Sequence, residues 1–192
     1  MENKIFAGID EVGRGCLAGP VISCAVVLKK NIKRKFLKDS KTIPFKDRIK
    51  IAKHIRQNSW YAIGLASVNE IDKYNIFNAT LLSMKRAVKK LKKKPHQFLI
   101  DGTHAPKDLK NSKTIIKGDQ KIKCISAASI VAKVYRDLYM IKLGKRFPEY
   151  KWQKNFGYGT KDHLEALKKF GVTNYHRKSY RPVHNILFKK VS

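Results

Sequence analysis

Two adjacent acids interrupt an apolar run near the start of the chain. Residues 5–9 are mostly apolar, as is typical of a buried strand, and Asp10 and Glu11 follow them directly. Neighbouring side chains in a strand point to opposite faces, so both acids reach one site only if the strand ends or bulges there. A buried carboxylate is costly unless it is paired or bound to a metal, whereas acids at an ordinary strand end simply face water. The spacing leaves both interpretations open, although several glycines permit the bend: Gly8, Gly13, Gly15 and Gly19.

A short cationic loop follows the two acids. Gly13, Arg14 and Gly15 combine a guanidinium with bare backbone amides, and both kinds of group bind phosphate or ribose. Acids that can hold a divalent metal, next to groups that can hold phosphate, indicate a site for a phosphodiester.

Two further acids follow apolar segments. Asp101 ends the run of residues 96–101, and Asp119 lies just beyond a short predicted strand at residues 114–116. Adjacent strands lie about 4.8 Å apart, so acids at strand ends can converge. Clustered carboxylates repel one another unless a divalent cation lies between them, and Mg²⁺ or Mn²⁺ prefers such oxygen ligands. Both acids also lie near a glycine, and on the residues alone a turn is the favoured interpretation for each.

Several short sequence blocks cover nearly the whole chain in a fixed order. Residues 8–20 read GIDEVGRGCLAGP, and further blocks lie at residues 39–41, 98–102, 117–119, 126–134, 157–160 and 176–180. This ordered set closely resembles ribonuclease HII, the type 2 ribonuclease H. One departure is Cys16, which stands where the family more usually has proline and which removes no functional group.

The resemblance implies an endoribonuclease that hydrolyses the RNA strand of RNA–DNA hybrids. It also implies cleavage 5′ of single ribonucleotides embedded in duplex DNA, with 5′-phosphate and 3′-hydroxyl ends as products. The metal-binding, catalytic acids of the family match Asp10, Glu11, Asp101 and Asp119. They imply two-metal-ion catalysis with Mg²⁺ or Mn²⁺ as cofactor.

Other positions are expected to bind the substrate. The resemblance implies that the loop after the first acids contacts the ribonucleotide and that Tyr158 stacks on the next sugar, where it senses the RNA-to-DNA junction. On the residues alone, a loop aromatic packed on the core is about equally open for Tyr158, and its flanking glycines favour the functional role. The expected substrate-binding residues, including cations for backbone phosphates, are Gly13, Arg14, Gly15, Ser40, Lys41, Tyr158, Arg177 and Lys178.

Composition points to a polyanionic partner and to a reducing compartment. Lysine and arginine total 43 residues against 14 acids, a net charge of +29, which indicates a polyanion, a compositional preference for lysine, or both. The three cysteines show no paired spacing, as expected in a cytoplasmic protein. We expect no signal peptide and no membrane helix, because no apolar run approaches the ~20 residues required. The resemblance implies that the polyanionic partners are RNA–DNA hybrid and ribonucleotide-containing duplex DNA, and we expect the protein to be a monomer.

Apolar periodicity predicts the elements that position these residues. Strands are expected from residue 5 and at residues 21–28, 60–67, 96–101 and 114–116, and the first two are expected to pair antiparallel. Helices are expected at residues 44–57, 68–94 (one or two, ended by Pro95), 126–146 and 162–170, before a basic tail. This order indicates an α/β fold with mixed pairing, in agreement with the ribonuclease H-like sheet flanked by helices that the resemblance implies. We expect residues 1–147 to form the catalytic domain and residues 148–192 a helical C-terminal extension packed on the cleft, within one structural unit.

Two alternatives belong to other functional classes. A non-catalytic RNA-binding protein of ribosomal type would explain the charge of +29 but predicts no acids inside an apolar run. Another ribonuclease H-like nuclease, such as an integrase or junction resolvase, would keep the fold. The Gly-Arg-Gly loop and the Gly157-Tyr158-Gly159 block argue against that alternative. Asp137, on the long helix, is expected to cap or to pair with arginine or lysine.

Overall fold

A five-stranded sheet forms the centre of the structure, a computed structural model that describes residues 4–29, 37 and 44–188. The strands lie in the order β3 (Ser59–Ala66), β2 (Val21–Leu28), β1 (Phe6–Val12), β4 (Gln97–Asp101) and β5 (Ser112–Ile115). The β1–β2 and β2–β3 pairs are antiparallel, whereas the β1–β4 and β4–β5 pairs are parallel. The predicted mixed sheet and its antiparallel first pair are confirmed.

The central strand, β1, brings the first acids to an edge of the sheet. Ala7 and Ile9 have no exposed surface, as the apolar run predicts. Ile9 lies opposite Ile100 of the parallel strand β4. Parallel neighbours end at the same edge, so the residues that follow these two, Asp10 and Asp101, lie side by side at that edge.

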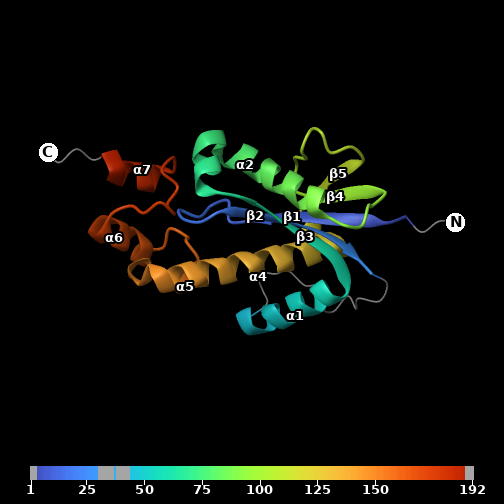
Figure 1. Ribbon diagram of the computed structural model, residues 1–192, viewed down its shortest axis with the longest axis horizontal. Helices are drawn as coiled ribbons and strands as arrows, with labels where there is room; N and C mark the ends of the chain where they lie inside the picture. The colour runs from blue at the N-terminus through green and yellow to red at the C-terminus, as the bar shows by residue number, and fades with distance from the viewer. Residues whose placement is uncertain (1–3, 30–36, 38–43, 189–192) are drawn as a thin grey trace.

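Helices cover both faces of the sheet (Figure 1). α2 (Val68–Lys90) lies on one face, and α1 (Phe45–Gln57) and α4 (Lys123–Arg146) lie on the other, so the α/β class is confirmed. The start of α4 lies directly against β1, because a Cβ added to Gly8 would lie only 2.1 Å from the backbone carbon of Cys124. Glycine at this position permits the close contact between helix and strand backbones.

The long helix α2 is interrupted and stops earlier than predicted. A capping box begins it: the Ser67 hydroxyl accepts from the amide of Glu70, whose carboxylate accepts from the amide of Ser67. Asn75 has non-helical dihedral angles (φ 63°, ψ 167°), so the element consists of two helical pieces. The helix ends at Lys90, before Pro95 is reached, and the prediction that Pro95 ends it is wrong.

The C-terminal segment folds into short helices packed against the start of the chain. Trp152 and Leu167 share one buried apolar cluster with Leu17 and Met140. Figure 1 shows these helices at the end of the molecule opposite the start of β1. The elements are the 3₁₀ helix η2 (Pro148–Tyr150), α5 (Trp152–Asn155), α6 (Lys161–Phe170) and α7 (Arg181–Phe188), the last of which lies where only a basic tail was expected.

Other element bounds differ slightly from the prediction. α4 begins at Lys123 rather than Ser126, and β5 begins at Ser112 rather than Thr114. Asp119 lies in a short helix, α3 (Gly118–Lys121), directly after β5. None of the helices in the described part of the chain is long and apolar enough to cross a membrane.

A buried ion-pair network ties α1 to α4. The Asp137 carboxylate has no exposed surface and accepts hydrogen bonds from Arg48 at 3.0 Å and from Lys133 at 2.8 Å. This confirms the prediction that Asp137 pairs with cationic side chains. Both cations are largely buried too, with 10% and 16% of their side chains exposed. Loss of the central carboxylate would leave two desolvated cations facing one another.

We therefore expect Asp137→Asn to lower the free energy of unfolding by about 3–5 kcal/mol, the usual cost of breaking a buried pair. Asp162→Asn is the matched control, since its pair with Lys151 at 3.1 Å is about half exposed and is worth less than about 1 kcal/mol. Urea unfolding of both variants measures the difference. Equal losses in the two variants would show that the buried network contributes no special stability.

Candidate active site

The first acid of the candidate site, Asp10, is buried near the end of β1, which continues through both acids to Val12 rather than ending at Asp10. Only 6% of Asp10 is exposed, and its carboxylate accepts a hydrogen bond from the amide of Glu11 at 2.7 Å. Burial raises the pKa of Asp10 well above its usual value, and the neighbouring carboxylates of Glu11 and Asp101 raise it further. A hydrogen bond from Ser129 on α4 opposes that rise. The structure thus brings a desolvated carboxylate into the field of two others.

Glu11 lies beside the cationic loop. Burial also raises the pKa of Glu11, and the Arg14 guanidinium, 3.2 Å from its carboxylate, opposes the rise. About half of the Arg14 side chain remains exposed. Part of the Arg14 side chain is therefore accessible to a ligand, while its guanidinium forms an ion pair with Glu11.

The third and fourth acids are joined through backbone amides. Asp101 ends β4, and its Oδ1 accepts hydrogen bonds from the amides of Gly118 at 2.7 Å and of Asp119 at 3.4 Å. This contact holds the first turn of α3 against the end of β4. The backbone of Asp119 therefore lies next to Asp101 at the edge of the sheet where Asp10 also lies.

The acids supply the carboxylate oxygens that hard cations prefer, but the described side chains are not arranged as a complete metal site. Within residues 4–29, 37 and 44–188, no three histidine, cysteine, aspartate or glutamate side chains are arranged to hold a metal ion. The chemistry of the donors nevertheless fits Mg²⁺ or Mn²⁺, because both ions prefer carboxylate oxygens. The raised pKa of buried Asp10 reflects repulsion and desolvation, which a divalent cation would relieve.

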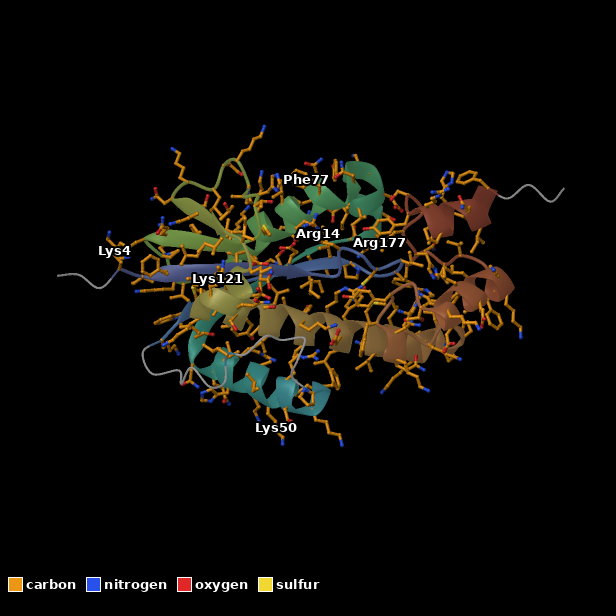
Figure 2. All side chains as sticks on the ribbon, turned by 180° about the vertical axis from the view of Figure 1, so that it is seen from behind. Lys4, Arg14, Lys50, Phe77, Lys121 and Arg177 are labelled. Atoms are coloured by element: carbon orange, nitrogen blue, oxygen red, sulfur yellow. The ribbon has the colours of Figure 1, made fainter. Side chains whose placement is uncertain are left out.

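The Gly-Arg-Gly loop is held from behind by a buried arginine. Arg177 has no exposed surface and donates to the carbonyls of Gly13 at 2.6 Å, Arg14 at 2.7 Å and Gly19 at 3.0 Å. Gly13 has a φ of +93°, a conformation that favours glycine. Figure 2 shows Arg14 and Arg177 close together between the sheet and the C-terminal helices.

This geometry corrects the expected role of Arg177. Its guanidinium is enclosed by loop carbonyls and is not exposed to a backbone phosphate, so Arg177 shapes the loop. Lys178 is exposed, and its amide and that of Ser179 cap the Asp72 carboxylate at 3.0 and 2.9 Å. The other two expected phosphate ligands, Ser40 and Lys41, lie outside the described residues.

A second buried arginine, Arg136 on α4, joins the loop to the C-terminal segment. It donates to the carbonyls of Pro20 at 3.1 Å, Ala18 at 2.9 Å and Phe156 at 2.8 Å. Arg136 was not among the site residues predicted from the sequence. The available signal was a charged residue within the apolar repeat of a long helix, and that signal does not identify its partners.

Tyr158 lies in the loop between α5 and α6, against the same segment. The Gly157 carbonyl accepts a hydrogen bond from the amide of Leu17 at 2.8 Å, and 39% of Tyr158 is exposed. The ammonium of Lys133 lies 5.7 Å from the centre of its ring. Burial, with a contribution from Cys16, raises the pKa of the phenol. Tyr158 and the segment at residues 8–20 are thus neighbours in space, although far apart in sequence.

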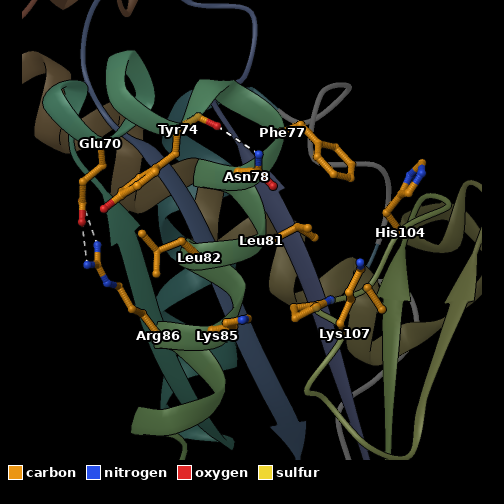
Figure 3. A pocket seen from close by; sticks show the side chains of 12 residues that line it. Glu70, Tyr74, Phe77, Asn78, Leu81, Leu82, Lys85, Arg86, His104 and Lys107 are labelled. Carbon is orange, nitrogen blue, oxygen red and sulfur yellow. Dashed lines mark hydrogen bonds and ion pairs between the residues drawn. The ribbon is translucent and has the colours of Figure 1, made fainter.

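A cavity of about 740 Å³ lies between α2 and the loop after β4 (Figure 3). Two cations of its lining are paired with acids, Arg86 with Glu70 at 2.6 Å and Lys85 with Asp108 at 2.9 Å. None of the four candidate acids lines this cavity, so the candidate active site is separate from it. Its lining residues are Glu70, Tyr74, Phe77, Asn78, Leu81, Leu82, Lys85, Arg86, His104, Ala105, Pro106 and Lys107.

Solved structures share the fold. The ribonuclease H2 from Pyrococcus horikoshii matches with a TM-score of 0.79 at 24% identity, over 95% of this chain and 96% of that chain. Bst-RNase HIII, solved in complex with Mn²⁺, matches with a TM-score of 0.77 at 17% identity, over 96% of this chain and 69% of that chain. The expected ribonuclease H-like fold is therefore confirmed.

Sequence relatives are closer. The ribonuclease HII of Pelagibacter ubique is 56% identical over 96% of this chain and 100% of its own length. That of Staphylococcus epidermidis is 48% identical over 96% of this chain and 72% of its own length. The family model described as ribonuclease HII matches residues 7–190. On this match and these identities, the chain belongs to the ribonuclease HII family.

Proposed function

We propose that the chain is a divalent-metal-dependent endoribonuclease that hydrolyses the RNA strand of RNA–DNA hybrids and cuts 5′ of single ribonucleotides in duplex DNA. Membership of the ribonuclease HII family supports ribonuclease H endonuclease activity on hybrids. The observation that carries the finer proposal is the acid cluster at the ends of β1 and β4, directly beside the Gly-Arg-Gly loop. Metal-binding acids and ribose-binding amides then act on one phosphodiester.

The four acids have the central role in the proposed chemistry. Asp10, Glu11, Asp101 and Asp119 would hold Mg²⁺ or Mn²⁺. Two such ions, when bound, supply the charge that readies a water for in-line attack and stabilises the departing 3′-oxygen. Cleavage in this direction leaves 5′-phosphate and 3′-hydroxyl ends. Hydrogen bonds to Asp10 and Asp101 hold these carboxylates in fixed orientations before substrate arrives.

The loop at residues 13–15 is proposed to recognise the ribonucleotide. Arg177 binds the carbonyls of Gly13 and Arg14, which leaves the amide side of the loop and the exposed Arg14 guanidinium for the substrate. The 2′-hydroxyl is the group that distinguishes RNA from DNA at one position, and backbone groups at close range can detect it. Gly15 suits this role, since a Cβ there would meet no heavy atom within 4 Å.

The remaining parts of the proposal concern binding of the duplex backbone, the cellular compartment and the oligomeric state. The positive charge would bind the duplex backbone, and exposed Lys178 is one phosphate ligand we propose. The three cysteines, Cys16, Cys24 and Cys124, are buried free thiols, which supports a reducing cytoplasm. We propose that the enzyme acts there as a monomer.

The acid assignment predicts that Asp10→Asn and Asp101→Asn abolish cleavage without unfolding the protein, because each change removes charge but little volume. The loss should exceed the ~10–100-fold typical of changes that only disturb the orientation of a metal ligand. Turnover in Mg²⁺ on a duplex with one ribonucleotide measures it, with Asp162→Asn as an exposed control and a melting curve for each variant. Near-normal turnover in either active-site variant would refute the assignment.

Binding to a polyanion predicts a steep salt dependence. Substrate affinity should fall with a log–log slope of roughly 0.9 per phosphate contact, because each contact releases a condensed counterion. Titration of catalytically inactive Asp10→Asn with labelled hybrid at several salt concentrations measures the slope. A flat response would show that the lysines reflect composition rather than substrate binding.

The stacking role of Tyr158 predicts a graded loss. Tyr158→Ala should slow cleavage of a single embedded ribonucleotide by about one to two orders of magnitude, because stacking is worth about 1–3 kcal/mol. Tyr158→Phe should be milder, since the ring remains. Tyr135→Ala, at another exposed tyrosine, is the control. If Tyr158→Ala cuts normally, or loses activity only by unfolding, the residue is not a junction sensor.

A further inference from the structure

Two buried histidines lie behind the Tyr158 loop. His163 on α6 and His176 near the C-terminal end have no exposed surface, and their Nε2 atoms lie 3.0 Å apart. The indole Nε1 of buried Trp152 also lies 3.0 Å from Nε2 of His163. On its other side, the Nδ1 atom of His163 lies 2.9 Å from the backbone carbonyl of Tyr158. The cluster thus reaches the residue proposed to read the substrate junction.

The partners determine where each proton lies. The Trp152 indole can only donate, so Nε2 of His163 must accept. In a neutral imidazole the proton is then on Nδ1, from which it is donated to the carbonyl of Tyr158. The backbone amide of Thr173 donates to Nδ1 of His176 at 3.0 Å, and the Thr173 hydroxyl lies 2.9 Å from the same atom. His176 therefore carries its proton on Nε2, and this proton shares the single lone pair on Nε2 of His163 with the Trp152 indole in a three-centre hydrogen bond. Both rings therefore satisfy their partners only when neutral.

Burial favours the same state. It lowers the pKa of His163, and it lowers that of His176, with a contribution from His163, to about 3. The aromatic surroundings are tight: the His176 ring lies 4.9 Å from that of Tyr150 and 5.2 Å from that of Trp152. The imidazoles cannot rotate freely in such packing, so the direction of the hydrogen bond to Tyr158 is fixed.

The Tyr158 backbone is held at several points, and one of the bonds that the structure describes comes from a side chain of α6. Its amide donates to the Asn155 carbonyl at 2.9 Å, and its carbonyl accepts from the Thr160 amide at 2.8 Å. These two bonds are local to the loop and move with it. The bond from His163 instead joins the loop to the buried aromatic cluster, and through that cluster to His176.

We propose that His163 is a positioning residue, which orients Tyr158 for recognition of the RNA-to-DNA junction through the bond from Nδ1 to the Tyr158 carbonyl. Trp152 and His176 select the tautomer that makes this bond, in the way that a second hydrogen bond sets the tautomer of a histidine. The inference rests on the stacking role proposed for Tyr158. Selectivity for a single embedded ribonucleotide therefore depends on residues that never touch the nucleic acid.

The kinetic test is a double-mutant cycle on two substrates. His163→Phe keeps a ring but loses the donor, and it should slow cleavage of a single embedded ribonucleotide by about tenfold, with a smaller effect on a continuous hybrid. His163→Asn, whose amide can replace the Nδ1 donor, should restore most of the rate. In the Tyr158→Ala background, His163→Phe should cause no further loss, because both changes disable one unit. His184→Phe, at an exposed histidine of α7, is the control.

The outcomes separate the two proposals. If His163→Phe slows cleavage equally in the wild-type and the Tyr158→Ala backgrounds, the positioning role is overturned. It is also overturned if His163→Phe cuts at the normal rate although Tyr158→Ala is slow. A normal rate for Tyr158→Ala would overturn the junction role itself.

The positions of the two protons can also be measured directly by nitrogen-15 NMR of the unmodified protein with labelled histidine. This measurement needs no substrate and does not depend on the folding of a variant. At pH 7 we expect a proton on Nδ1 of His163 and on Nε2 of His176, and an imidazolium or the opposite tautomer at either ring would overturn the inference.

Discussion

Two buried guanidinium groups organise the candidate active site. Arg136 and Arg177 donate to carbonyls of the segment between Gly13 and Pro20, and Arg136 also donates to Phe156 beside the Tyr158 loop. Burying a cation is costly unless its donors are matched, and here backbone oxygens match them. A Cβ on Gly13 would lie 2.1 Å from Nε of Arg136, so the cation and the loop backbone are packed in direct contact. The loop, the long helix and the C-terminal segment consequently form one framework.

Within that framework, a group of buried and partly buried acids lies next to a group of cationic side chains. At the ends of β1 and β4, burial and mutual repulsion disfavour the ionised acids, as the raised pKa of Asp10 indicates. At the adjoining loop, the exposed Arg14 and the buried Arg136 and Arg177, which reach the loop from distant parts of the sequence, concentrate positive charge. A divalent cation would relieve the first imbalance, and an approaching phosphodiester would relieve the second. A site of this kind would be stabilised by metal and substrate together, in agreement with the function proposed above.

The C-terminal segment completes the site from behind. Apolar contacts join Trp152 and Leu167 to Leu17, and the Gly157 carbonyl binds the Leu17 amide at 2.8 Å. The same aromatic cluster holds the neutral His163–His176 pair beneath the Tyr158 loop. Packing thus fixes the position of the Tyr158 loop, because a dense core has few alternative arrangements.

The sequence alone determined the α/β class, the mixed sheet and the end of β4 at Asp101, because apolar periodicity and strand length are local properties. It did not determine the end of β1, which continues past Asp10 to Val12. Ordered motifs identified the family. Tertiary structure decided the role of Arg177, which looks like a phosphate ligand in sequence but is enclosed by loop carbonyls. It also decided the roles of Arg136 and the two histidines. The contacts of the two arginines with the loop join residues more than a hundred positions apart, and those of the histidines join different elements. No local pattern records such contacts.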